Sequence, residues 1–257
     1  MTTNINPRLT QAFRFVRCSY ANGVAELVYA FDHGEELIER VRFPNAPALP
    51  ASHHAAFDNA LKMLHLIAGV SYYKAGIPPR IEVANGPLDD ATADLLDALY
   101  LHGLAEFAYR NGLDLRGRIN FPRGGDKQPE AKALGLPHRT LVPIGGGKDS
   151  LVAVEAIKSM GGEATAVWVG NSPLIAACAE RTGLPMLNNT HNPTLNPNRH
   201  WVRQNRLKAA RLRTSASSGN GQALIEITPQ LIEVRWTLFR LFAVVAVVLI
   251  LTVVVVL

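Results

Sequence analysis

The sequence predicts an α/β protein in which a small α+β domain precedes a domain built on a parallel sheet, with a hydrophobic C-terminal tail. Three observations lead to this prediction. Strand-like segments and hairpin signals dominate residues 13–43, strand-like and helix-like segments alternate after residue 139, and the last seventeen residues are almost wholly apolar. The N-terminal domain is expected at 1–121, followed by a linker at 122–138 and an incomplete second domain at 139–198. A basic and polar linker at 199–235 and the hydrophobic tail at 236–257 complete the chain.

The first domain is expected to open with a three-stranded antiparallel meander. Its strands are predicted at 13–20, Val24–Phe31 and 37–43. Asn22-Gly23 is a strong two-residue hairpin signal, and residues 32–34 are expected to form the second turn.

Two amphipathic helices and a short strand should follow the meander. Residues 55–74 carry apolar side chains at helical spacing, and a strand is expected at 81–83. A second helix is predicted at 89–109, with an apolar face made of Leu95, Leu96, Leu99, Tyr100 and Leu104. Residues 122–137 are polar and rich in glycine and proline, which is typical of a linker.

The second domain shows a β-α-β-α-β alternation. Strands are expected at 140–144 and Ala164–Val169 and from Met186, and helices at 151–158 and 172–181. Ser172 is the expected N-cap of the later helix. Such alternation predicts parallel strands with right-handed crossovers, and ligands bind at the carboxyl ends of these strands.

A glycine-rich segment lies at the first of those carboxyl ends: Gly145, Gly146, Gly147, Lys148, Asp149 and Ser150. Glycines allow a ligand to approach the backbone closely, and the free N–H groups of a helix N-terminus attract phosphate. The kinase-type pattern G-x-x-x-x-G-K-[ST] fails, because Asp149 follows Gly147-Lys148. The dinucleotide pattern G-x-G-x-x-G fails too, because Ser150 stands at its last glycine.

The segment resembles the S-G-G-x-D-S loop of the PP-loop ATP pyrophosphatases, so the second domain is expected to be a PP-loop domain, similar to the adenine nucleotide hydrolases. Residues 146–150 match, whereas Gly145 replaces the leading serine and one hydroxyl donor is lacking. The resemblance implies that residues 145–150 bind the pyrophosphate part of ATP. Lys148 would supply charge, Ser150 a hydroxyl and Asp149 a ligand for Mg²⁺. The alternative is a plain strand–turn–helix corner with Asp149 or Ser150 as the N-cap.

Taken together, residues 13–187 resemble the bacterial UDP-N-acetylmuramoyl-L-alanyl-L-glutamate epimerases. Four segments carry the resemblance: 13–20, 66–74, 100–107 and 144–150. It implies an ATP- and Mg²⁺-dependent isomerase of peptidoglycan precursor synthesis that acts on a UDP-linked muramoyl dipeptide. The terminal L-glutamate would become D-glutamate through an acyl-adenylate, with release of AMP and pyrophosphate.

The residues leave the acid and base of such an epimerisation unassigned. Cys18 and Cys178 are similar in kind to the paired cysteines of cofactor-independent racemases, but they fall in different predicted domains. The resemblance ends near residue 188. Two other functions therefore stay open: another PP-loop enzyme that adenylates its substrate before amidation or thiolation, and a non-catalytic, membrane-tethered nucleotide-binding remnant.

The C-terminal part of the chain carries the excess positive charge and a hydrophobic tail that could anchor the protein in a membrane. Six basic residues lie between 199 and 213 with no acid among them, and subtracting six from the net charge of +5 leaves −1. The net positive charge of the chain therefore comes from this one segment, and no nucleic-acid partner is expected. Residues 241–257 would span about 26 Å as a helix, slightly less than a hydrocarbon core. A membrane anchor and a frameshifted tail are both open, and the protein is otherwise expected to be cytoplasmic because the N-terminus has no secretory signal.

Overall fold

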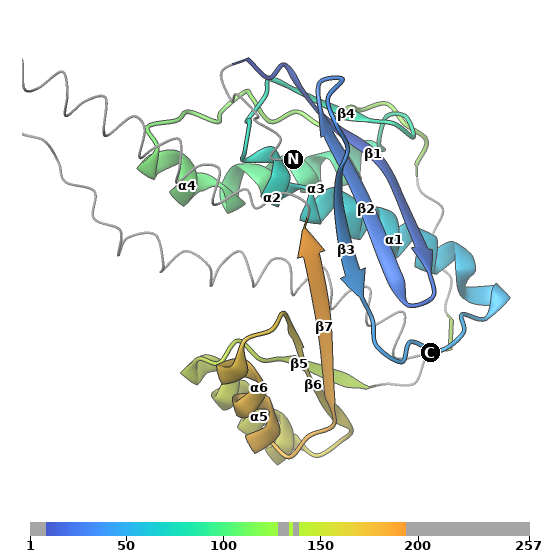
Figure 1. Cartoon of the computed structure of the whole chain (residues 1–257), viewed down its shortest axis with the longest axis vertical. Coiled ribbons are helices and arrows are strands. Elements are labelled where there is room, and N and C mark those ends of the chain that lie inside the picture. The colour runs from blue at the N-terminus through green and yellow to red at the C-terminus, as the bar shows by residue number, and fades with distance from the viewer. Residues whose placement is uncertain (1–8, 128–133, 136–138, 194–257) are drawn as a thin grey trace, which may run out of the picture.

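The computed structural model describes residues 9–127, 134–135 and 139–193, which form one mixed seven-stranded sheet with helices packed on it (Figure 1). The strand order is β4-β1-β2-β3-β7-β6-β5. The strands are β1 (Ala12–Ala21), β2 (Val24–Phe31), β3 (Leu37–Arg42), β4 (Arg80–Val83), β5 (Thr140–Pro143), β6 (Ala164–Val169) and β7 (Met186–Pro193). The helices are α1 (His54–Ala68), α2 (Val70–Tyr73), α3 (Asp90–Gly103), α4 (Ala105–Arg110), α5 (Lys148–Met160) and α6 (Pro173–Arg181), and a single 3₁₀ turn, Ala51–His53, precedes α1.

The predicted antiparallel meander is confirmed. β1 pairs with β2, and β2 pairs with β3, both antiparallel. The turn between β1 and β2 has positive φ at both central residues, 50° at Asn22 and 73° at Gly23, as a type I′ turn requires. The short strand β4 then adds to the outer side of β1 in parallel.

Strand β7 joins the two parts of the sheet (Figure 1). Its first half, from Met186 to Asn189, pairs with β6 in parallel, and its second half, from Thr190 to Pro193, pairs with β3 antiparallel. The sequence predicted only the start of this strand. Because β7 belongs to both parts, the sheet is continuous across the boundary expected at 122–138, and the division into domains stays a prediction.

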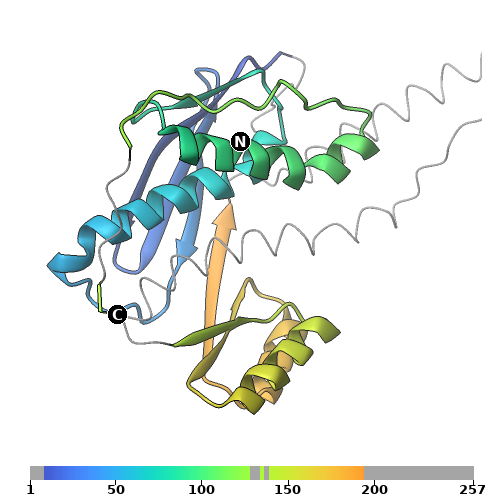
Figure 2. The same cartoon turned by 180° about the vertical axis from the view of Figure 1, so that it is seen from behind.

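An aromatic core lies between β1–β4 and the helices α1–α4, which gather on one face of these strands (Figures 1 and 2). The ring of Phe13 is fully buried and lies 5.1 to 5.9 Å, between ring centroids, from four other aromatic rings: Phe15, Tyr29, Phe31 and Tyr73. Aromatic pairs at such distances stabilise a core beyond the area they bury.

The two predicted N-terminal helices are each divided in the structure. The helix expected at 55–74 is interrupted at Gly69, where an added Cβ would lie 2.4 Å from Cε1 of Phe15. Glycine is needed there because the helix backbone touches the sheet's aromatic side chain. The helix expected at 89–109 ends at Gly103, and α4 begins after Leu104, which has φ −97° and ψ 2°.

The prediction that the apolar face of α3 is buried is wrong for one residue. Leu96, Tyr100 and Leu104 are fully buried, as expected, but Leu95 is 52% exposed. Neighbouring positions on a helix point about 100° apart, and in this helix Leu96 faces the core while Leu95 points to solvent. The predicted start of this helix is confirmed, since Asp89 is its N-cap and the carboxylate of Asp89 accepts the N–H of Thr92 at 3.0 Å.

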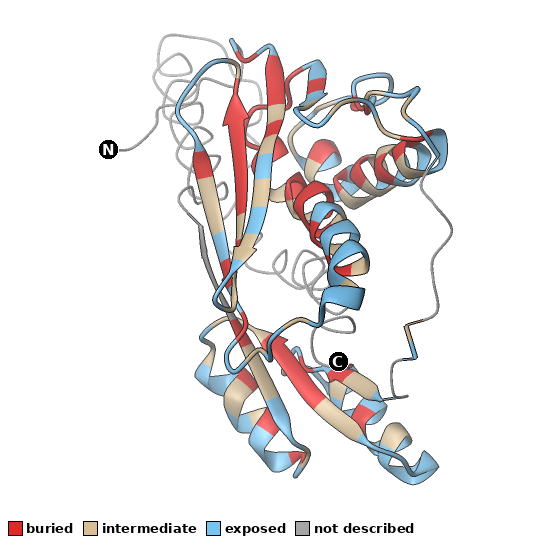
Figure 3. Cartoon of the chain, turned by 90° about the vertical axis from the view of Figure 1, so that its right-hand side faces the viewer, coloured by how far each residue is buried: buried red, intermediate tan, exposed pale blue. Residues whose placement is uncertain are grey.

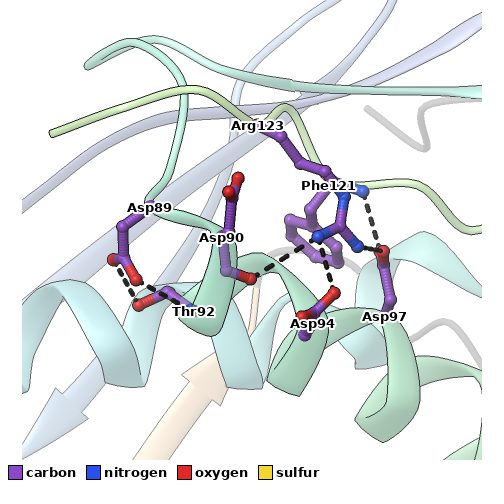
Figure 4. Close-up of polar contacts among 7 residues, drawn as sticks. All are labelled: Asp89, Asp90, Thr92, Asp94, Asp97, Phe121 and Arg123. Carbon is purple, nitrogen blue, oxygen red and sulfur yellow. Dashed lines mark hydrogen bonds and ion pairs between the residues drawn. The ribbon is translucent and has the colours of Figure 1, made fainter. Parts of the chain in front are cut away.

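A cluster of charged side chains ties the start of the predicted linker to α3 (Figure 4). Arg123 donates to Asp94 and Asp97, both at 2.6 Å, and Asp97 also accepts the N–H of Phe121 at 2.8 Å. The Phe121 ring is buried against Tyr100 at a centroid distance of 5.0 Å. Asp97 therefore fixes the point from which the chain leaves the aromatic core towards β5.

The second part of the sheet follows the predicted parallel alternation. β5 pairs with β6, and β6 with β7, in parallel. Helices α5 and α6 cover one face of these strands, and Val142, Val154, Trp168 and Ile175 are buried between them. On the other face Val167 belongs to the same buried cluster as the aromatic core.

Candidate functional site

The glycine loop lies at the carboxyl end of β5, as the sequence predicts. The N–H of Ile144 donates to the carbonyl of Val167 at 2.8 Å, which holds the end of β5 on β6. The chain then passes through Gly145, Gly146 and Gly147 and enters α5 at Lys148. Because β5, β6 and β7 run in parallel, the loop lies at the edge of the sheet where such folds bind ligands.

The hydroxyl of Ser150 closes the loop on itself. Its oxygen accepts the N–H of Gly145 at 2.9 Å. The helix begins at Lys148, three residues earlier than predicted, and its N-cap is Gly147. The interpretation of Asp149 or Ser150 as the N-cap is therefore wrong.

A glycine N-cap leaves the helix N-terminus without a side-chain acceptor. No side chain caps α5, so the N–H groups of its first turn have no side-chain partner among the described residues. These groups, together with the helix dipole, create a partial positive charge that favours an anion. The described geometry therefore leaves backbone N–H groups at the start of α5 free to bind an anion.

The three glycines of the loop differ in what the fold requires of them. Gly146 has φ 77°, and an added Cβ would lie 3.3 Å from Cγ1 of Ile175, so glycine is required there. Gly147 has φ −96° and ψ 166°, an extended conformation that any residue adopts, and an added Cβ would meet no atom within 4 Å. At Gly145 an added Cβ would make only an ordinary contact, 3.6 Å from the oxygen of Ser150.

The two charged residues of the loop face solvent. Lys148 and Asp149 are exposed, and neither makes an ion pair or side-chain hydrogen bond with another described residue. In the described part of the chain no cluster of three or more histidine, cysteine or acidic side chains is arranged to hold a metal. A magnesium site at this loop would therefore consist of the Asp149 carboxylate together with phosphate oxygens of a ligand, which is a usual arrangement for Mg²⁺.

Sequence reasoning missed three buried polar groups near the carboxyl end of β6 and in the half of β7 that pairs with it. Trp168 Nε1, Asn188 Oδ1 and Asn189 Nδ2 are buried without a hydrogen-bond partner in the described structure. Trp168 and Asn188 are opposite each other on the paired strands. The signal available in the sequence was the pair Asn188-Asn189, which follows the first two residues of the strand predicted from Met186. Just after β6, the N–H of Gly170 donates to the carbonyl of Asn189 at 2.8 Å.

The two cysteines do not form a pair. Cys18 packs against the aromatic core, whereas Cys178 packs in the cluster under α6, and both are free thiols. Burial raises the pKa of the Cys18 thiol above its ordinary value. A thiol with a raised pKa is a poorer source of thiolate, so nothing in this geometry favours a two-cysteine mechanism.

The described helices do not include one that is both long and apolar enough to cross a membrane. The predicted basic linker and the hydrophobic tail, 199–235 and 236–257, lie outside the described residues.

Comparison with known proteins connects this fold to one family. The sequence profile of the MurL N-terminal domain matches residues 4–198. A UDP-N-acetyl-alpha-D-muramoyl-L-alanyl-L-glutamate epimerase from Xanthomonas oryzae pv. oryzae is 56% identical over 179 residues, which is 68% of this chain and 40% of that protein. Proteins of the same name from Micromonospora sp. and Salinispora tropica are 35% and 36% identical over 71% and 70% of this chain, and 42% and 41% of their own length. The chain spans about two fifths of the length of these curated relatives, and no solved structure matches it.

Proposed function

The chain belongs to the family of the MurL N-terminal domain, and from this premise we propose that it serves the ATP-dependent epimerisation of UDP-N-acetylmuramoyl-L-alanyl-L-glutamate. The terminal L-glutamate of this peptidoglycan precursor would be inverted to D-glutamate. The three relatives that carry this activity in their names support the proposal. The contribution proposed for this chain is the loop from Gly145 to Ser150, with ATP and Mg²⁺ as its ligands.

Each loop residue has a proposed role that its position supports. The uncapped N–H groups at the start of α5 and the exposed ammonium of Lys148 would hold the β- and γ-phosphates. Asp149, at the second position of the helix, would be a ligand for Mg²⁺, which would offset the negative charge of the phosphates. Ser150 would keep the loop closed through its bond to the N–H of Gly145.

The chemistry explains why an epimerase would bind ATP. Removing the α-hydrogen beside a free carboxylate builds negative charge next to an existing anion. In the proposed reaction a carboxylate oxygen attacks the α-phosphorus of ATP, the bond to the bridging oxygen breaks, and pyrophosphate leaves. The resulting acyl-adenylate has lost the carboxylate charge, so its carbonyl can accept the electron pair of the carbanion. A base then removes the proton and an acid returns one on the other face.

The observation that carries the proposal is the conformation of Gly147. Neither its dihedral angles nor its surroundings require glycine, and an asparagine or aspartate would be a better N-cap. A residue that the free fold does not need, and that leaves helix N–H groups uncapped, is explained by a ligand that approaches the backbone at that point.

The first experiment separates binding from folding at this position. In Gly147→Asp the new carboxylate should cap α5, so the free energy of unfolding should stay within a few tenths of a kcal/mol or rise. The same carboxylate should repel phosphate and lower the affinity for Mg·ATP at least tenfold, measured by titration calorimetry. Leu95→Asp, which adds the same charge on the exposed side of α3, is the matched control. Unchanged affinity in Gly147→Asp would refute the phosphate site.

The second experiment tests the reaction itself. The protein is incubated with UDP-N-acetylmuramoyl-L-alanyl-L-glutamate and Mg·ATP beside the intact Xanthomonas oryzae relative. We expect release of AMP, with D-glutamate recovered after hydrolysis of the product. AMP release without D-glutamate would favour a different adenylating activity, and ATP binding without AMP release would leave the chain as a binding module.

A further inference from the structure

A stripe of exposed apolar side chains runs along α5. Val152, Ala156 and Met160 follow one another at four-residue spacing, so they lie on one side of the helix. Val152 is 68% exposed and Met160 is 78% exposed, while the buried side of the helix is made by Val154. Elsewhere the exposed surface of α5 includes the Glu155–Lys158 ion pair, so the helix is not apolar all round. Large apolar side chains gathered on an exposed surface mark a site where another element can pack.

The strand beside this helix also has an uncovered edge. β5 is the last strand of the described sheet and pairs with β6 on one side only. The N–H groups of Thr140 and Ile144 donate towards β6, so the N–H of Leu141 points to the open edge. An edge strand presents unpaired N–H and C=O groups, and another strand can pair with them.

The comparisons indicate what covers these surfaces. This chain spans 40% of the Xanthomonas oryzae relative, so about three fifths of that protein has no counterpart in the match. The matching profile describes an N-terminal domain, which places most of the remainder on the C-terminal side. In chain order the remainder therefore follows β7, the last described element of the part of the sheet that also contains β5, α5 and α6.

We infer that the α5 stripe, together with the open edge of β5, is the docking surface for the C-terminal part of these longer relatives. That part would add a strand to β5 through the N–H of Leu141 and cover Val152, Ala156 and Met160. In this chain the same surface accepts the C-terminal part when it is supplied as a separate polypeptide. The inference concerns packing and does not depend on ATP binding at the loop.

The test measures the accessibility of one position in two settings. Val152→Cys is placed in the full chain, with Cys18 and Cys178 replaced by serine, and its rate of reaction with a maleimide is measured. The aligned residue is changed to cysteine in the intact Xanthomonas oryzae relative, whose C-terminal part is present. We expect labelling at least tenfold slower in the relative. Equal labelling rates at this position would overturn the inference.

A matched control and a second measurement keep the test specific. Leu95→Cys, at an exposed position of α3 in the first part of the sheet, should label equally fast in both proteins. Co-expression of the relative's C-terminal part with the full chain should give a complex that co-purifies, and Val152→Glu should reduce its yield while Leu95→Glu does not. In this complex the N–H of Leu141 should exchange with deuterium more slowly than in the chain alone.

Discussion

The two parts of the sheet enclose their apolar side chains to different extents (Figure 3). Around β1–β4, aromatic rings such as Phe13, Tyr29 and Tyr100 are fully buried beneath four helices. Around β5–β7 the buried cluster is small, and large apolar side chains are exposed: Leu151, Val152, Met160, Leu174 and Met186. The first part contributes most of a large core, to which Val167 of β6 also belongs, whereas the second part carries the glycine loop and has one open edge.

The largest expected difference comes from removing a core side chain from each part. Phe13→Ala deletes a ring with four aromatic neighbours and should lower the free energy of unfolding by about 3–5 kcal/mol. Val154→Ala, in the small cluster, should cost about 1–2 kcal/mol because fewer contacts are lost. Urea denaturation measures both, and equal costs would contradict the comparison.

The aromatic core should also be the pH-sensitive part. His65 is buried, its Nε2–H donates to the Val28 carbonyl at 3.0 Å, and burial lowers its pKa from 6.5 to about 4. Between these two values the unfolded chain binds a proton that the folded chain does not, so stability should fall as the pH drops from 6.5 to 4. The loss is about 3 kcal/mol at most, since each unit corresponds to about 1.4 kcal/mol.

The control for this prediction is a side chain that keeps the hydrogen bond without titrating. His65→Gln can still donate an N–H to Val28, and its stability should depend less on pH in this window. Denaturation curves at pH 6.5, 5 and 4 give both slopes. Identical slopes in the two proteins would show that other groups cause the acid sensitivity.

In the second part of the sheet, the expected effects are smaller and depend on backbone conformation. Gly146→Ala forces a side chain into the left-handed region and against Ile175, and should cost about 1–2 kcal/mol. Gly147→Asn fills open space at a helix N-cap and should change stability by less than about 0.5 kcal/mol. Thermal unfolding compares the two variants, and a larger cost at Gly147 would contradict the distinction drawn between these glycines.

The smallest expected effect concerns the connection between the two parts. Asp97→Ala removes the acceptor of the Phe121 N–H and should cost about 1 kcal/mol. Asp94→Ala removes only a partner of Arg123 from a side chain that is 71% exposed, and should have no measurable effect. Chemical denaturation distinguishes them. A similar loss in both variants would mean that the ion pairs of Arg123, rather than the backbone contact, hold the start of the linker.

Local signals in the sequence predicted the parts of the fold that short-range geometry controls. Asn22-Gly23 specified its turn because few residues adopt positive φ at both positions. Ser172 and Pro173 marked the start of α6, where the Ser172 hydroxyl accepts the N–H of Ile175 at 3.5 Å. The position of the glycine loop followed in the same way from a strand, a turn and a helix in succession.

Features that depend on contacts between distant segments were not predictable. The need for glycine at position 69 depends on the ring of Phe15, and the exposure of Leu95 depends on how α3 is rotated against the core. Which of the three loop glycines the fold requires depends on Ile175, on another helix. The ATP site and the reaction stay proposals, because the residues of the loop specify a geometry that favours phosphate and not the identity of a substrate.

The sequence by itself determined the order of strands and helices, the hairpin turn and the glycine loop, because each depends on the conformational preferences of a few adjacent residues. The tertiary structure alone decided that β7 pairs with β3 as well as β6, so that both parts share one sheet. It also decided that Gly147 leaves the first turn of α5 uncapped. The pairing of β7 with β3 arises from the three-dimensional arrangement of segments far apart in the chain, and no local pattern records it.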